Sequence, residues 1–237
     1  MCDTSEDFQA VRQQLRLAAK QGNADAQCTL GFMHHVGRGG PQDFAEARRL
    51  LGLAAAQGDA EAECLLGGMH IEGEGGPVDL AEARRLLGLA AAQGHARAQH
   101  NLGILYREGV GGPVDFAGAR RLYGLAAEQG HTAAQHMLGA MHRRGQGGLV
   151  DFAEARRLFR LGAAQGDAEA QYNLGLMHRR GESGPADFAE ARRLYGLAAA
   201  QGHANAQHDL GCMHRDGQGG PADFGEARRL YGLAAAQ

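Results

Sequence analysis

The sequence predicts an all-α protein, a solenoid of helical hairpins that repeat about every 36 residues. Glycine recurs at this spacing, at Gly22, Gly58, Gly94, Gly130, Gly166 and Gly202. Aromatic residues make up only 5% of the chain and tryptophan is absent, so the core must consist mostly of alanine and leucine, which favour helices. The chain has 38 glycines but only 5 prolines, which indicates punctuation between helices rather than disorder.

The repeat accounts for the whole chain and leaves no residues for a second domain. We assign an N-terminal half repeat, expected to be a capping helix, and six full repeats, at residues 1–22, 23–58, 59–94, 95–130, 131–166, 167–202 and 203–237.

Each repeat is predicted to be a pair of helices. In the first repeat, residues 24–36 form one helix, which ends at the Gly- and Pro-containing segment 37–41. Residues 43–57 form the second helix, and Gly58 suits the left-handed position that ends a helix.

Acidic residues mark the start of the second helix. Asp43 is expected to cap it, with Glu46 three residues later as in a capping box. The pair recurs at Asp79/Glu82, Asp151/Glu154, Asp187/Glu190 and Asp223/Glu226, whereas Asp115 is followed by Gly118. Glu46 can also pair with Arg49 along the helix.

Glycines at the positions of Gly31 and Gly52 are both expected to let neighbouring helices approach closely.

The repeat reads Ala26-Gln27-x-x-Leu30-Gly31-x-x-His34-x-x-Gly37-x-Gly39, then Asp43-x-x-x-Ala47 and Ala54-Ala55-x-x-Gly58. This pattern resembles the Sel1-like repeat, a relative of the tetratricopeptide repeat, in all six units and the leading half unit. One departure is that tyrosine, usual in that family, is retained only at Tyr106 and replaced by His34, His70, His142, His178 and His214. The resemblance implies a right-handed α-solenoid whose first helices line the concave face, as in protein-interaction scaffolds and adaptors.

Comparison of the repeats divides the first helix into two arcs. One arc is nearly constant and comprises Ala26, Gln27, Leu30, Gly31, Met33 and His34 and their equivalents. The other arc varies and comprises Asp25, Cys28, Thr29, Phe32, His35 and Val36 and their equivalents. The constant arc is expected to pack against neighbouring repeats. The variable arc, which the resemblance places on the concave face, is either unused surface or a recognition surface.

The variable arc carries the candidate binding residues. Arginines recur at Arg107, Arg143, Arg179 and Arg215, with Arg144 and Arg180 beside two of them. Nearby on the arc lie His100, Asn101, His136, Tyr172, Asn173 and His208, whose polar groups can orient a carboxylate or a peptide backbone. We expect a protein or peptide partner with an acidic segment. The alternative is a solvated face neutralised by Glu108, Asp209 and Asp216.

The sequence argues against nucleic-acid binding, a metal site and catalysis. A net charge of −3 argues against nucleic-acid binding. No CxxC pair is formed by the four cysteines, Cys2, Cys28, Cys64 and Cys212. The histidines at the repeat position of His34, called here the histidine column, lack the spacing of metal ligands, so we expect no metal and no cofactor. A cysteine-rich branch of the family makes a β-lactam hydrolase the alternative function. Its paired cysteines are absent here, and the only serines, Ser5 and Ser183, lie in neither SxxK nor GxSxG.

Location and assembly are predicted from the ends of the chain. The N-terminus lacks the apolar region of a signal peptide, and no apolar run of about 18 residues occurs, so we expect no membrane insertion. A cytoplasmic location is expected, with a nuclear one as the alternative. The chain ends at Gln237 without a closing glycine or polar capping helix. This predicts edge-to-edge self-association through the C-terminal repeat, with a fragment of a longer protein as the alternative.

Overall fold

The computed structural model describes residues 4–236, with side chains from Phe8 onward, and over this range it contains thirteen α-helices and no strand. Cys2 and the terminal Gln237 lie outside the described residues. The helices are α1 (Thr4–Lys20), α2 (Ala24–Val36), α3 (Phe44–Ala55), α4 (Ala60–Glu72), α5 (Leu80–Ala92), α6 (Ala96–Glu108), α7 (Phe116–Glu128), α8 (Thr132–Arg144), α9 (Phe152–Ala164), α10 (Ala168–Arg180), α11 (Phe188–Ala200), α12 (Ala204–Asp216) and α13 (Phe224–Ala235).

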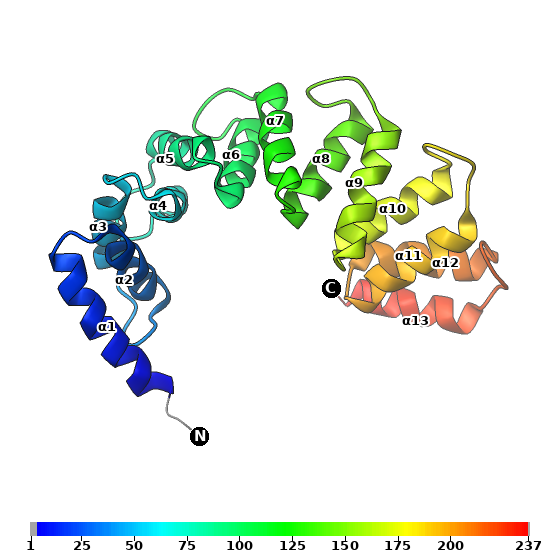
Figure 1. Cartoon of the computed structure of the whole chain (residues 1–237). Helices are drawn as coiled ribbons and strands as arrows, with labels where there is room; N and C mark the ends of the chain where they lie inside the picture. Colours follow the sequence, from blue (N-terminus) through cyan, green and yellow to red (C-terminus); the bar gives the residue numbers. More distant parts are fainter. Residues whose placement is uncertain (1–3, 237) are drawn as a thin grey trace. The chain divides into compact units, whose positions relative to one another are not determined.

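The chain divides into two compact units, Met1–Ala126 and Ala127–Gln237, and α7 spans the boundary. Consecutive helices pack against each other from α1 to α6 and from α8 to α13, and Gly103 of α6 lies against the Tyr123 ring of α7. In the N-terminal unit α2 also contacts α4, and the first helices of successive repeats lie along the same side (Figure 1). The predicted all-α array of helical hairpins is thereby confirmed.

Side-chain caps fix where each helix begins. The Asp43 carboxylate accepts the Glu46 backbone N–H at 3.0 Å, as predicted, and the equivalent aspartates do the same. The first helices are capped by Asn23, Asp59 and Asp167, and by His95, His131 and His203. In each histidine cap Nδ1 accepts a backbone N–H, from Ala98 at 3.1 Å in the case of His95. The histidine caps were not predicted, because histidine is not among the common capping residues.

The glycines at the repeat position of Gly31 and those at the repeat position of Gly52, called here the Gly31 and Gly52 columns, have different environments. In the Gly31 column, a Cβ at Gly139 would lie 2.9 Å from the ring of the fully buried Phe159, so this column does permit close packing of helices. At Gly52 and Gly88, in contrast, a Cβ would meet no atom within 4 Å. The expectation of close approach was therefore wrong for the Gly52 column, whose backbone faces open space rather than a neighbouring helix.

Buried amides join successive repeats. The Gln27 side chain donates to the Ala19 carbonyl of the preceding helix at 3.0 Å and accepts from Gln57 at 2.8 Å. Gln171 and Gln207 repeat the first contact. Glu63 takes the glutamine position in the second repeat, where it accepts from Gln93 at 2.8 Å, and burial raises its pKa.

The two arginines of the second helix have separate roles. Arg49 forms the predicted pair with Glu46, with both N–O distances 2.7 Å, and its equivalents in α5, α9, α11 and α13 do the same. Arg48 instead crosses to the next repeat, where it donates to His70 at 2.6 Å and to the Pro77 carbonyl. Arg12, Arg156 and Arg192 reach His34, His178 and His214 in the same way.

These contacts explain the histidine column. Burial, followed by the charge of the adjacent arginine, lowers the pKa of His34, His70, His178 and His214. The imidazoles are therefore held neutral as hydrogen-bond acceptors. At Tyr106, which keeps the tyrosine, Arg84 lies over the ring at 4.1 Å, a cation–π contact in place of the hydrogen bond.

Candidate functional site

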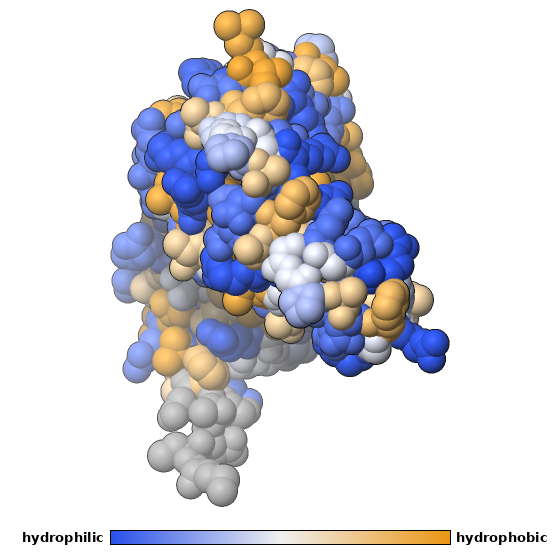
Figure 2. Space-filling view, turned by 90° about the vertical axis from the view of Figure 1, so that its right-hand side faces the viewer, coloured by the Kyte–Doolittle hydropathy of each residue, from blue (hydrophilic) through white to orange (hydrophobic). Residues whose placement is uncertain are grey.

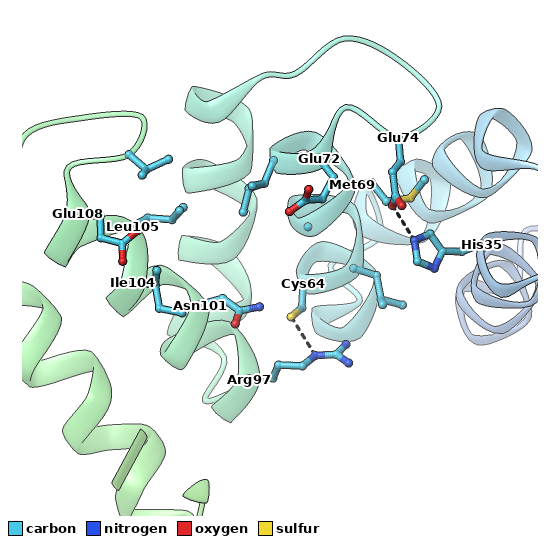
Figure 3. A pocket seen from close by; sticks show the side chains of 14 residues that line it. His35, Cys64, Met69, Glu72, Glu74, Arg97, Asn101, Ile104, Leu105 and Glu108 are labelled. Carbon is cyan, nitrogen blue, oxygen red and sulfur yellow. Dashed lines mark hydrogen bonds and ion pairs between the residues drawn. The ribbon is translucent and has the colours of Figure 1, made fainter. Parts of the chain in front are cut away.

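In the N-terminal unit the variable arc of the first helices lines a pocket of about 550 Å³. Most of its wall is apolar and comes from Leu65, Met69, Ile71, Ile104, Leu105 and Val110. Figure 3 shows Glu72 of α4 and Asn101 of α6 pointing from the two helices toward the same open space. The volume lies within the range of roughly 300–1,000 Å³ that is usual for ligand pockets.

A single glycine makes room for this pocket. Gly68 occupies the position that Phe32, Ile104, Leu176 and Cys212 hold in other repeats, and a Cβ there would meet no atom within 4 Å. The pocket was not predicted from the sequence, although its signal is present there. A helical glycine in a column that otherwise bears side chains indicates a local hollow.

Acidic groups predominate at the rim of the pocket. Glu72 is exposed and has no ion-pair partner among the described residues. Glu74 contacts His35 at 2.7 Å, and Glu108 contacts Arg107 at 2.6 Å. The one arginine of the lining, Arg97, forms an ion pair with Glu61.

Cys64 faces the pocket as a thiol rather than a thiolate. Arg97 Nε lies 3.4 Å from its Sγ, as Figure 3 shows, but burial outweighs this contact and raises the pKa of Cys64. Burial likewise raises the pKa of Cys28 to about 12. Neither cysteine is prepared as a nucleophile, because nucleophilic cysteines have a lowered pKa.

The C-terminal unit contains most of the predicted binding residues, and several of them bond to one another. Arg143 Nη1 donates to Asn173 Oδ1 at 3.1 Å, and Arg143 Nε lies 3.1 Å from Glu182. Asn173 is buried and also contacts His136 Nε2 at 3.3 Å. The Arg143 side chain is only 13% exposed, so these residues form an internal network that holds α8 against α10.

An aromatic cluster lies beside this network. Tyr172 stacks on His203 with ring centroids 4.7 Å apart, and its hydroxyl donates to Asp209 at 3.3 Å. Arg179 lies 3.8 Å from Asp209 and within 5.9 Å of the Tyr195 ring centre. Burial, with Asp209 next in importance, raises the pKa of Tyr172. Asp209 thus neutralises Arg179, as the alternative interpretation of this face requires.

The remaining predicted residues are more accessible. The side chains of Arg180 and Arg215 are both 52% exposed, and they lie 3.6 Å from Glu182 and 2.7 Å from Asp216. Arg144 and His208 are exposed as well. In the view of Figure 2, apolar residues are scattered among hydrophilic ones instead of forming one broad patch.

His100, Asn101 and Arg107 belong to the N-terminal unit. His100 packs beside Tyr123, with ring centroids 5.7 Å apart, and its Nδ1 lies 3.2 Å from Asn101 Oδ1. Asn101 is the member of the predicted set that lines the pocket.

Over the described residues, no three His, Cys, Asp or Glu side chains come together as a metal site. None of the helices in residues 4–236 is long and apolar enough to cross a bilayer.

Comparison with known proteins identifies the repeat. The model of the Sel1 repeat matches residues 24–59, 60–95, 96–131, 132–167, 168–203 and 204–237. The chain belongs to the Sel1 repeat family. Proteins with Sel1 repeats generally mediate protein–protein interactions, and the match indicates no catalytic family.

Two solved structures are similar to this Sel1-repeat chain over almost its whole length. One is c5321, a protective antigen of uropathogenic Escherichia coli, with 34% identity and a TM-score of 0.90 over 95% of this chain. The chain spans about half of that structure, 48% of its length. The other is a Sel1 repeat protein from Oxalobacter formigenes, with 28% identity and a TM-score of 0.86, covering 97% of this chain and 92% of that one. No curated protein matches the sequence.

The fold is also shared with more distant proteins. The immunity protein Pa5087 from Pseudomonas aeruginosa is 18% identical, with a TM-score of 0.50 over 90% of this chain and 81% of its own.

Proposed function

We propose that the chain is a non-enzymatic interaction scaffold that binds protein segments on the variable face of its first helices. The observation that carries this proposal is the difference in burial between the repeating and the varying positions of each first helix. Positions that repeat are buried between neighbouring repeats, as Gln27 and Gln171 are, whereas several positions that vary line an open pocket or stay exposed, among them Glu72, Arg144 and Arg180.

In the C-terminal unit we propose that an acidic segment binds near Arg144, Arg180 and Arg215. These side chains are exposed, and a guanidinium group can bind a carboxylate through two hydrogen bonds. Arg215 already makes two such bonds to Asp216, so Arg144 and Arg180 are the main contacts proposed for the ligand. Arg143 and Arg179 serve this site by holding the surface in place, since both are drawn into contacts with Glu182 and Asp209. Reversal of their charge would disturb the fold, so the test requires the exposed arginines.

The test compares affinity capture from a native lysate, followed by mass spectrometry, for the unmodified chain and two double variants. Arg144→Gln with Arg180→Gln removes two cations from the proposed surface. Arg157→Gln with Arg193→Gln removes two equally exposed cations from the second helices. We expect the first variant to lose a set of proteins with shared acidic segments and the second to keep it. Capture of the same set by all three chains would contradict the acidic-segment proposal.

A further inference from the structure

The pocket around Gly68 differs in chemistry from the surface around Arg144, Arg180 and Arg215, called here the arginine surface, although both lie on the variable arc. The last residue of the first helix is Glu72 in α4 and Glu108 in α6, but Arg144 in α8 and Arg180 in α10. The charge at this repeat position therefore changes sign between α6 and α8, although Asp216 at the end of α12 is again acidic. Two surfaces with opposite charge do not select the same ligand.

The apolar wall of the pocket requires an apolar guest. Leu65, Ile71 and Ile104 line the space that Gly68 leaves open. Transfer of an aliphatic or aromatic side chain from water into this space is favourable in proportion to the area buried. Asn101 supplies an amide beside the apolar wall, which can hydrogen-bond to the backbone of a peptide.

The rim requires a cation next to that apolar group. Glu72 has no ion-pair partner among the described residues, and it ends α4, where the negative end of the helix dipole adds to its charge. Glu108 ends α6 in the same way. The Arg97 guanidinium is occupied by Glu61, so it does not neutralise Glu72.

We infer that the Gly68 pocket is a second recognition site, which binds a peptide segment carrying a bulky apolar side chain next to a lysine or arginine. The apolar side chain fills the space above Gly68, and the cation pairs with Glu72. That the guest is a segment of a protein rests on the proposed function, whereas its apolar and cationic character rests on the pocket alone.

The probe is a phage-displayed library of short random peptides, selected on the full chain and, in parallel, on the Gly68→Leu variant. This variant fills the pocket, and since a Cβ at Gly68 meets open space and leucine favours helix more than glycine does, the fold is preserved. Gly88→Leu is the matched control, because Gly88 lies in mid-helix of α5 and is equally open, but outside the pocket.

We expect peptides that bind the unmodified chain and the Gly88→Leu variant but not the Gly68→Leu variant, and that share an apolar residue next to a lysine or arginine. A synthetic peptide of this kind should bind at least tenfold more weakly to Gly68→Leu. It should bind several-fold more weakly to Glu72→Gln, with a smaller dependence on salt, because one screened charge pair is lost.

Two results would overturn the inference: no peptide that depends on Gly68, or Gly68-dependent peptides that lack the cation. Neither result bears on the arginine surface, since a loss of acidic partners from the Arg144/Arg180 variant is measured separately. If that variant and the Gly68→Leu variant both bind every partner of the unmodified chain, the proposed function itself fails.

Discussion

Ser183 is a residue whose backbone conformation is unfavourable for its side chain. Among the described non-glycine residues it alone has a positive φ, of 68°. The equivalent position is glycine in the other repeats, with φ of 72° at Gly39 and 71° at Gly219. For a residue with a Cβ the left-handed region costs roughly 1–2 kcal/mol.

We therefore expect Ser183→Gly to raise the free energy of unfolding by about 1 kcal/mol, measured by urea denaturation followed by circular dichroism. The Ser183 carbonyl, which accepts from Arg156 at 2.8 Å, is retained in this variant. Ser183→Ala keeps the Cβ and should bring no gain. An equal gain in both variants would show that the hydroxyl, not the backbone, is unfavourable.

The residue scale also shows which caps sequence reasoning can find. Asp43 was predicted because aspartate accepts backbone N–H groups in many proteins. His95 was not, although it occupies the repeat position of Asn23 and Asp59, both common capping residues. Its role depends on Nε2 contacting Glu61 of the preceding repeat at 2.8 Å while Nδ1 accepts from Ala98. That contact between repeats has no signature within one repeat.

At the scale of the helix, the two glycine columns predict opposite effects of the same substitution. Gly88→Ala should raise the free energy of unfolding by about 0.5–1 kcal/mol, because alanine favours helix and its Cβ meets open space. Gly139→Ala should lower it by about 1–3 kcal/mol, because its Cβ would press on Phe159, which is fully buried and cannot yield. Denaturant midpoints of the two variants measure the difference directly.

The comparison is internally controlled, since both variants add one methyl group in the middle of a helix. Destabilisation by Gly88→Ala would mean that the Gly52 column lies against atoms after all. The sequence could not separate the two columns, because both are glycines inside helices. Only the neighbouring helix decides whether the missing side chain is needed.

At the scale of the whole molecule, the repeat period predicted the fold but not the distribution of charge. The period, the caps and the pairing of Glu46 with Arg49 are local, and each is present in the structure. Which of the recurring arginines can reach a ligand depends on the acids that lie across from them, and the sequence left open whether acids neutralise them. Glu182, in a loop of a later repeat, contacts Arg143, and this contact was not foreseen.

The histidine–arginine contacts give the array a pH dependence. In the folded chain the pKa of each of His34, His70, His178 and His214 is lowered from 6.5 by burial and by an arginine. Below pH 6.5 the unfolded chain therefore binds protons that the folded chain does not bind, and the free energy of unfolding decreases as the pH is lowered. Glu63, whose pKa burial raises, acts in the opposite direction.

We expect the free energy of unfolding to fall between pH 7.5 and pH 5.5, a window above the titration of the Arg-paired glutamates, whose pKa lies below 4.5. Each pKa unit by which a histidine is lowered corresponds to about 1.4 kcal/mol at the acid limit. His178→Tyr with His214→Tyr should reduce this fall, because the double variant removes two imidazoles that take up protons in the unfolded chain. Tyr106 shows that the adjacent arginine can stack on a phenol ring at this position. Equal pH dependence in the double variant and the unmodified chain would mean that the histidine column does not control stability, and that the arginines tolerate a protonated imidazole beside them.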